Sequence, residues 1–380
     1  MKDFILIIFL FSLFACGNES QYKKANIFLP VLIDSSEFNS LVGGKKVQLF
    51  TLKNKSGIIS QITNYGGRVV SMWTPDRDGS FEDIVLGYDN FQAYQGSEES
   101  YFGALIGRYS NRIGNGNFQL NGKQYHLHRN NGTNHLHGGG KGFDAKVWDA
   151  NQINDQQLEL TYLSPNGEEG YPGNLSIKVL YSLTDENELK VEYWATTDAT
   201  TIVNLTHHSY FNLLGAGNGS ILNHTLRINA DYYTPVDSTL IPNGEIASVK
   251  GTPMDFRSPV FIGKRIDDDF EQLKFGKGYD HNWVLNKGNN QLSLAAEVSE
   301  PNTGRTMEVY TNEPGMQFYT GNFLSRNNKG KNTKPYFRRS AFCLETQHFP
   351  DSPNHDNFPT TVLNPGEEYY SICIYKFGVE

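Results

Sequence analysis

Histidines are the residues of this sequence whose spacing first suggests chemistry. Four of the ten histidines fall within twelve residues, as His126-Leu127-His128 and His135-Leu136-His137. Because residues two apart on a strand share a face, each pair could present two imidazoles to a metal ion. The second pair, however, runs into Gly138-Gly139-Gly140, where a strand ends, and no carboxylate or cysteine lies close by in the sequence. We therefore expect no catalytic zinc and a hydrogen-bonded structural role for most of these histidines.

One carboxylate and one further histidine are candidates for proton transfer. Glu345 ends the apolar run 341–344 and enters a loop rich in proline. A buried carboxylate is costly unless it is paired or used, and desolvation raises its pKa toward the range of a general base. Only one of the adjacent His207 and His208 can face a given site, because alternate strand residues point to opposite sides. Asp280, in a polar turn, is a weaker candidate; a salt bridge at Glu345 remains an equal alternative.

Alternation of apolar and polar residues predicts the elements that position these side chains. Short alternating runs separated by Gly, Pro, Asn and Asp clusters recur from residue 45 onward, which indicates one all-β domain, an antiparallel sandwich or barrel, over 45–380. Asn121-Gly122 between two such runs predicts a tight hairpin turn. Helices are few, and 262–273 is the best candidate. The predicted strands are 45–53, 58–63, 68–73, 157–163, 175–183, 189–195, 202–210, 225–229, 306–311, 341–346 and 370–377.

Composition limits the class of protein and its partners. The chain has 380 residues, 38% of them hydrophobic and 19% charged, so it can bury a large core. Its net charge of -8 and the absence of a basic run disfavour nucleic acid as a partner. Aromatic residues make up 13% of the chain, and they suit a sugar site and a sandwich core equally well. Cys343 and Cys373 lie in apolar, strand-like segments, and we expect two buried free thiols.

The first residues differ from the rest of the chain. The apolar stretch 4–15 behind Lys2 is too short to span a bilayer and has the length of a signal-peptide core, so we expect residues 1–15 to be removed. Leu13-Phe14-Ala15-Cys16 resembles the lipobox of bacterial lipoproteins, in which the cysteine is lipidated. Residues 16–44 would then form a lipidated N-terminus and tether. The expected protein is exported to the periplasm and touches a membrane only through this anchor.

An ordered set of motifs resembles the aldose 1-epimerase (galactose mutarotase) family over nearly all of 45–380. These motifs are Asn64-Tyr65-Gly66-Gly67, Gly107-Arg108, Asn111-Arg112-Ile113, Asn134-His135-Leu136-His137-Gly138-Gly139, Gly167-Glu168-Glu169-Gly170-Tyr171-Pro172-Gly173, Asn204-Leu205-Thr206-His207-His208-Ser209-Tyr210-Phe211-Asn212, Asp280-His281-Asn282, Glu313-Pro314-Gly315-Met316-Gln317-Phe318-Tyr319-Thr320-Gly321-Asn322, Leu344-Glu345-Thr346-Gln347 and Phe349-Pro350-Asp351. The resemblance implies a large antiparallel β-sandwich and interconversion of the α and β anomers of free aldoses such as glucose and galactose.

The resemblance also implies roles for single residues. Glu345 would be the base at the anomeric hydroxyl, His208 the acid at the ring oxygen, and His137 would assist at that oxygen. The residues implied to hold the sugar hydroxyls are Asn111, Arg112, Asp280 and Gln317.

The chemistry requires no cofactor or metal, and a monosaccharide is the expected partner of a chain that we expect to be a monomer. Some bacterial relatives are associated with calcium, but Asp267-Asp268-Asp269 is too weak a signal to place an ion. A sugar-binding module without activity and a glycoside hydrolase are the alternatives. The first would not need both Glu345 and His208, and the second would leave the histidines without a role.

Overall fold

The structure is a computed structural model that describes residues 28–380 apart from 98, 100, 289–290 and 326–327. The expected signal peptide over 1–15 and the expected lipidation site Cys16 lie outside the described residues. Within the described part of the chain, no helix is long and apolar enough to cross a membrane.

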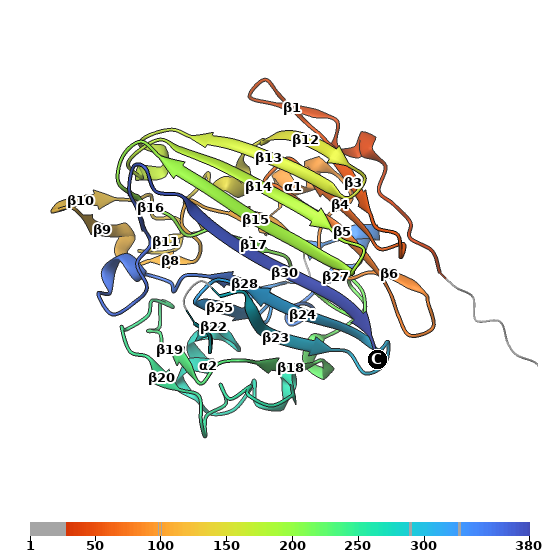
Figure 1. The fold of residues 1–380 in the computed structure, drawn as a ribbon. Helices are drawn as coiled ribbons and strands as arrows, with labels where there is room; N and C mark the ends of the chain where they lie inside the picture. Colours follow the sequence, from red (N-terminus) through yellow and green to blue (C-terminus); the bar gives the residue numbers. More distant parts are fainter. Residues whose placement is uncertain (1–27, 98, 100, 289–290, 326–327) are drawn as a thin grey trace, which may run out of the picture.

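A nine-stranded antiparallel sheet forms the large outer layer of the molecule (Figure 1). Alternation places one face of each long strand in the core: in β14 the odd-numbered residues from Leu175 to Leu183 are buried, whereas Ser176 and Lys178 are exposed. In sheet order the strands are β12 (Asp149–Asn154), β13 (Gln157–Ser164), β14 (Leu175–Leu183), β15 (Glu188–Thr197), β30 (Tyr369–Val379), β24 (Arg305–Thr311), β23 (Ser293–Ser299), β18 (Thr225–Ile228) and β21 (Val260–Phe261).

Two smaller antiparallel sheets pack against this layer, and several of their strands are buried on both faces. Every residue of β4, β25 and β28 is buried. The five-stranded sheet runs β20 (Ala247–Ser248), β19 (Tyr232–Thr234), β22 (Asp280–Val284), β25 (Gly315–Tyr319) and β28 (Cys343–Gln347). The four-stranded sheet runs β3 (Leu49–Lys53), β4 (Ile59–Thr63), β5 (Arg68–Pro75) and β6 (Phe81–Asp83). A core of aliphatic and aromatic side chains, with Trp148, Tyr181 and Trp283 fully buried, joins the layers. The fold is a large antiparallel β-sandwich.

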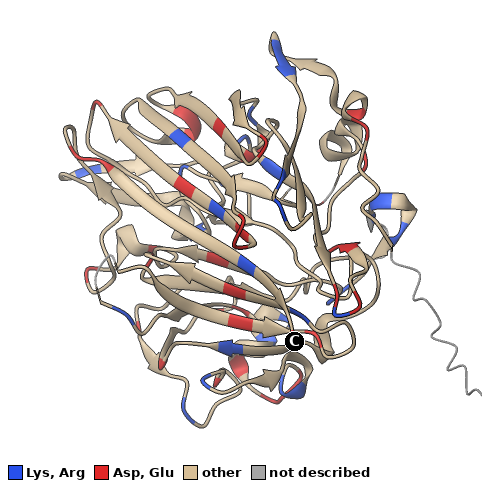
Figure 2. Ribbon diagram, turned by 45° about the vertical axis from the view of Figure 1, so that its right-hand side comes forward, with Lys and Arg blue, Asp and Glu red and all other residues tan. Residues whose placement is uncertain are grey.

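Among the described residues, six two-stranded pairings complete the fold. The paired strands are β1 (Ser40–Val42) with β2 (Lys45–Val47), β7 (Ala104–Ile106) with β17 (Thr206–His208), β8 (Arg112–Ile113) with β11 (His135–Leu136), β9 (Asn117–Leu120) with β10 (Lys123–His126), β16 (Thr201–Ile202) with β29 (Val362–Leu363) and β26 (Asn328–Lys329) with β27 (Pro335–Tyr336). The helices are α1 (Phe91–Gly96) and α2 (Glu271–Gly276), besides short 3-10 turns. Basic and acidic residues are interspersed along the strands, and no basic stripe follows any of them in the view of Figure 2.

The predicted all-β fold is confirmed, and so is the tight hairpin. Asn121 and Gly122 join β9 to β10 with φ of 50° and 76°, as a twisted two-residue turn requires. Cys343 and Cys373 are both buried free thiols.

Three predicted elements differ from the structure. The run 45–53 divides into β2 and β3, which pair with β1 and β4 respectively. The run 202–210 divides into β16 and β17, because its two ends pair with different strands, β29 and β7. The helix expected over 262–273 is a 3-10 turn (Ile262–Lys264) and, separately, α2. Between them, Asp267 and Asp269 form ion pairs with Arg339 and Lys274. Aspartate is a poor helix former, and these pairings hold the segment in a loop.

Ordered structure begins before residue 45, where the sequence placed the end of the tether. β1 pairs with β2 across that position, so the expected boundary falls inside a hairpin. Phe38 is fully buried, and the side-chain amide of Gln61 bonds the backbone N–H and carbonyl of Ile33 at 2.9 and 2.8 Å. Residues 33–44 therefore belong to the packed domain.

Buried histidines should make folding sensitive to acid. Burial lowers the pKa of His207 and of His224 to about 4, so each binds a proton more readily in the unfolded chain. Their contribution to stability is complete above about pH 6.5 and is lost as pH falls toward about 4. Asp144 opposes this loss, because burial raises its pKa to about 6. We expect the free energy of unfolding in urea to be at least about 2 kcal/mol lower at pH 5 than at pH 7.

The matched variants are His207→Asn and His126→Asn, since His126 is exposed. His207→Asn should flatten the pH dependence, whereas His126→Asn should leave it unchanged. Equal free energies of unfolding at the two pH values in the unsubstituted protein would contradict the prediction.

Candidate active site

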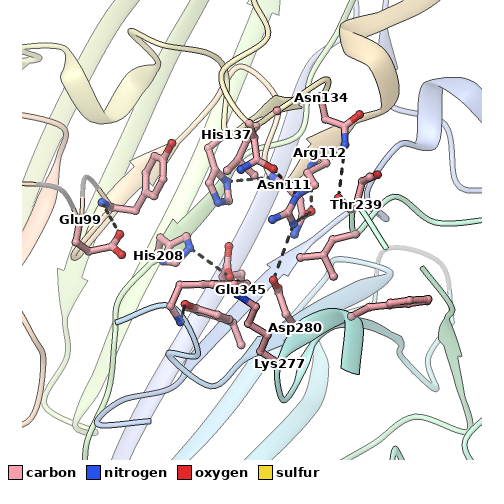
Figure 3. A pocket seen from close by; sticks show the side chains of 18 of the residues that line it. Glu99, Asn111, Arg112, Asn134, His137, His208, Thr239, Lys277, Asp280 and Glu345 are labelled. Carbon is pink, nitrogen blue, oxygen red and sulfur yellow. Dashed lines mark hydrogen bonds and ion pairs between the residues drawn. The ribbon is translucent and has the colours of Figure 1, made fainter. Parts of the chain in front are cut away.

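A cavity of about 520 Å³ opens beside the end of the five-stranded sheet (Figure 3). Its lining combines side chains from β17, β22, β25 and β28 with loops that precede β7 and β8 and follow β10, β11 and β19. The space suffices for a monosaccharide with water, and the wall is both polar and aromatic. The polar residues that line it include Asn111, Arg112, Asn134, His137, His208, Asp280 and Glu345.

Strand register brings the carboxylates to this cavity. Glu345 is the middle residue of β28 and lies opposite Gln317 of β25, which lies opposite Asn282 of β22. Asp280 is two residues before Asn282 and therefore projects from the same face. The side-chain amide of Gln317 donates a hydrogen bond to Asp280 at 2.7 Å. One face of the sheet thus presents two acids toward the cavity.

His137 is held by an exchange of hydrogen bonds with Asn111. Both residues have left-handed backbone conformations, with φ of 52° and 56°, at the place where β11 ends beside the start of β8. The His137 N–H donates to the Asn111 carbonyl at 2.9 Å, and the Asn111 N–H donates to Nδ1 of His137 at 3.2 Å. Because a backbone N–H can only donate, Nδ1 accepts and the proton of this imidazole lies on Nε2. Burial, with His208 and Arg112 nearby, lowers the pKa of His137 well below its usual value.

His208 and Glu345 face each other inside the cavity. Nε2 of His208 lies 3.5 Å from Oε1 of Glu345, and the two side chains are only 5% and 2% exposed. Burial raises the pKa of Glu345 well above its usual range; Asp280 adds to this shift and Arg112 opposes it. Burial lowers the pKa of His208 to about 3. Both shifts disfavour charge, so the pair holds a single proton, on the carboxyl group when no ligand is bound.

Arg112 and Asp280 form a second polar pair across the cavity. Nη1 of Arg112 lies 4.0 Å from Oδ2 of Asp280, and Nε of Arg112 donates to the side-chain oxygen of Asn131 at 3.1 Å. Asn111 accepts a hydrogen bond from the Arg112 backbone at 2.9 Å. Burial raises the pKa of Asp280, an effect that Arg112 and Gln317 counteract. A planar guanidinium and a carboxylate at this spacing suit the vicinal hydroxyls of a sugar.

The structure brings together the seven residues singled out in the sequence. Six of them line the cavity, and Gln317 lies behind Asp280. The other histidine motifs lie elsewhere: Nε2 of His135 bonds the Tyr171 hydroxyl at 2.6 Å, and His207 packs between Tyr181 and Tyr375. The expectation that only one of His207 and His208 faces the site is confirmed.

Sequence reasoning missed residues that reach the cavity from irregular segments. The ring of Tyr101 stacks on His208 at 5.8 Å between centroids and meets His137 edge-on at 4.6 Å. Glu99 lines the cavity and accepts a hydrogen bond from the Tyr101 backbone at 3.2 Å. Tyr210 also stacks on His208, at 5.0 Å between centroids. No spacing signal marks these residues among the many aromatic and acidic side chains of the chain.

His137, His208 and Glu345 also bring three potential metal ligands within 4.8 Å of one another. A metal ion would need the lone pair of Nε2 of His137, but that nitrogen carries the proton, because Nδ1 is already an acceptor. The donor set therefore fits a metal poorly. It fits proton transfer well, since it offers a fixed N–H donor and a carboxyl–imidazole pair with one proton.

Fold and site together define a class: an antiparallel β-sandwich whose polar cavity is equipped for acid–base chemistry on a small hydroxylated ligand. A sequence model of the aldose 1-epimerase family matches residues 48–376. The galactose mutarotase of Bos taurus is 45% identical over 338 residues, which cover 89% of this chain and 96% of that protein. The aldose 1-epimerase of Escherichia coli (strain K12) is 39% identical over 339 residues, covering 89% and 97%.

Solved structures agree with the sequence relatives. An aldose epimerase homologue from C. elegans has a TM-score of 0.81 at 30% identity and covers 88% of this chain and 99% of its own. Galactose 1-epimerase from Lactobacillus acidophilus has a TM-score of 0.78 at 30% identity, covering 90% and 97%. The chain belongs to the aldose 1-epimerase family and is an isomerase. A sugar-binding module without activity and a glycoside hydrolase are not favoured.

Gly138 should prove essential to the placement of His137. Its φ is +84°, and a Cβ there would lie 1.8 Å from the carbonyl oxygen of Gly107. Gly138→Ala must therefore shift the backbone beside His137, and we expect a loss of stability above about 2 kcal/mol together with weaker sugar binding. Urea unfolding and calorimetric titration with galactose measure the two effects.

The matched control is Gly122→Ala. Gly122 has a similar φ of +76°, but a Cβ there would meet nothing within 4 Å. We expect a cost of about 1 kcal/mol from backbone strain alone and unchanged sugar binding. Equal behaviour of the two variants would contradict the prediction.

Proposed function

We propose that this chain is a mutarotase that interconverts the α and β anomers of free aldoses such as glucose and galactose by acid–base ring opening and reclosure. The observation that carries the proposal is the His208–Glu345 pair, 3.5 Å apart and buried at one cavity. Family membership and the presence of a cavity large enough for a hexose support it. The reaction changes no oxidation state, so an acid and a base suffice.

The proton shared by the pair accounts for the chemistry. When the sugar is bound, the proton moves from the carboxyl group of Glu345 to Nε2 of His208. Glu345 then takes the proton of the anomeric hydroxyl while Nε2 of His208 gives its proton to the ring oxygen. The bond from C1 to the ring oxygen breaks, leaving an open-chain aldehyde. Rotation about C1–C2 presents the other carbonyl face, and the reverse transfers close the ring. Each transfer moves one proton from imidazolium to carboxylate or back, so the pair holds one proton throughout. Burial disfavours full charge separation in the resting pair, which suits reversible transfer.

The remaining site residues orient the sugar. His137 cannot carry a second proton while its Nδ1 accepts from Asn111, so it donates a hydrogen bond from Nε2 at the ring oxygen instead of transferring a proton. The residues proposed to hold the other hydroxyls are Asn111, Arg112 and Asp280, while Gln317, expected from the resemblance to do the same, lies behind Asp280 and holds its carboxylate. Holding the hydroxyls keeps the open-chain sugar between base and acid during the rotation. The chemistry calls for no cofactor.

We also propose that Cys16 is lipidated after removal of residues 1–15 and anchors an exported, monomeric domain at a periplasmic membrane surface. The apolar stretch ending in Leu13-Phe14-Ala15-Cys16 supports this proposal. The family model matches residues 48–376, and the segment 1–16 lies outside that match.

Polarimetry of freshly dissolved α-glucose and α-galactose tests the activity and its acid–base pair. The full-length chain should speed the approach to anomeric equilibrium, and Glu345→Gln and His208→Asn should each lower kcat at least about 100-fold. Glu159→Gln and His126→Asn, which change the same residue types outside the cavity, should act as the unsubstituted chain does.

Two results would contradict the proposal in different ways. A spontaneous rate that the unsubstituted chain leaves unchanged, for these and related aldoses, would remove the activity. Variants that keep full activity would remove the roles given to Glu345 and His208.

The lipid anchor predicts where the protein is found. The full-length chain should be recovered with membranes and carry a lipid on Cys16 by mass spectrometry, whereas Cys16→Ser should be recovered without lipid and largely outside the membrane fraction. Ser20→Ala is the control and should behave as the unsubstituted chain. Mature protein that retains Met1 in the cytosol would contradict the proposal.

A further inference from the structure

We propose that Cys343 is a positioning residue for the acid of the site: its sulfur accepts the Nδ1 proton of His208 and so keeps Nε2 as the nitrogen that exchanges a proton with the sugar. This inference rests on the proposed function and adds a residue to it.

Strand geometry places the thiol behind the imidazole. Cys343 begins β28 two residues before Glu345, so both side chains project from the same face of the strand. Sγ of Cys343 lies 3.6 Å from Nδ1 of His208, within hydrogen-bonding range for sulfur. The cysteine is fully buried, and the histidine is 4% exposed. One strand therefore contacts both nitrogens of the same ring, Nδ1 through Cys343 and Nε2 through Glu345.

The proposed reaction requires an acceptor for the hydrogen on Nδ1 of His208. When imidazolium releases its proton from Nε2, the neutral ring that remains carries its hydrogen on Nδ1. In both states Nδ1–H needs an acceptor, and the partner of one nitrogen determines what the other can do. If the hydrogen moved to Nε2, the ring could no longer take back the proton on ring closure. An acceptor at Nδ1 prevents that exchange, and Sγ of Cys343 is in place to be one.

A thiol suits this position better than a carboxylate, as a second histidine of the chain shows. Nδ1 of His348 lies 2.6 Å from the buried carboxylate of Glu313, which raises the pKa of His348 in spite of its burial. A carboxylate beside Nδ1 of His208 would in the same way hold the proton on that imidazole and weaken it as an acid. Burial raises the pKa of the Cys343 thiol, which therefore stays uncharged and accepts only weakly. The imidazolium of His208 is then a strong acid.

Apart from the backbone carbonyl of His208 itself, which favours the protonated ring, the groups that face His208 do not compete for Nδ1. Glu345 on β28 faces Nε2, and His137 and Tyr101 pack against the ring from two loops. Tyr210 stacks on the ring from the end of β17. Arg68 on β5 and His207, the neighbour of His208 on β17, disfavour the charged form of His208.

Three variants separate this role from general packing. Cys343→Ala removes the acceptor, Cys343→Ser restores one, and Cys373→Ala removes the second buried thiol, which lines no part of the cavity. With full-length protein and galactose, Cys343→Ala should lower kcat about tenfold, the value of one hydrogen bond, with KM within about twofold. Cys343→Ser should recover kcat to within about threefold, and Cys373→Ala should keep it.

Long-range ¹⁵N–¹H spectra of the imidazoles give a readout that does not depend on activity. The His208 signals, assigned by their loss in His208→Asn, should show hydrogen on Nδ1 in the unsubstituted chain and a mixture of tautomers in Cys343→Ala. Unchanged kcat in Cys343→Ala, an equal loss in Cys373→Ala, or hydrogen on Nε2 in the unsubstituted chain would overturn the proposal.

The measurements also distinguish a failure of the proposed mutarotase function from a failure of the role proposed for Cys343. An inactive unsubstituted chain would remove the mutarotase function, while the spectra would still decide the contact between Cys343 and His208. Should Cys343→Ala fail to fold, the kinetics of Cys343→Ser and the spectra of the unsubstituted chain decide it: a tenfold loss in a folded serine variant would overturn the acceptor role.

Discussion

The removal of Glu345 and His208 from water is the constraint on which the rest of the site depends. In water near pH 6 the carboxyl group would be ionised and the imidazole largely protonated, so the proton would stay on the imidazole. Burial raises the pKa of Glu345 and lowers that of His208, so the two groups compete for one proton across 3.5 Å. A sugar that enters between them meets an acid and a base whose proton can move either way, as a reversible reaction between two anomers needs.

The sandwich supplies that dry environment at a cost in stability. Because β25 and β28 are buried on both faces, polar side chains on them face a cavity in the interior and not open solvent. Oε2 of Glu345 and Oε1 of Gln317 make no hydrogen bond within the described part of the protein. Each such atom costs about 1–3 kcal/mol. The extensive core shared by the large sheet and the five-stranded sheet offsets this cost, so the site can keep an acceptor of Glu345 free for a ligand.

Alternation in the sequence predicted most long strands of the large sheet and also β4 and β28, which are buried on both faces, but it missed β22 and β25. In β14 and β15 apolar and polar residues alternate, so the sequence predicts both strands. β22 and β25 carry polar residues on the face toward the cavity, and their sequences do not alternate in this way. Glu345 and His208 could be singled out because a carboxylate after an apolar run and a histidine pair are unusual. The roles of Asn111, Arg112, Asp280 and Gln317 came from family resemblance alone. Tyr101 and Glu99 reach the site through a loop, where no periodic pattern exists to reveal them.

The two histidines of the cavity show how their partners assign different chemistry to the same side chain. A backbone N–H of Asn111 points at Nδ1 of His137, and a donor in that place forbids the cationic ring and fixes hydrogen on Nε2. At His208 the corresponding nitrogen faces the sulfur of Cys343, which can accept a hydrogen and so permits the cation. The rings lie 5.1 Å apart in one cavity, and burial lowers the pKa of both. The groups behind the rings, rather than those inside the cavity, therefore make one histidine a fixed donor and the other a proton carrier.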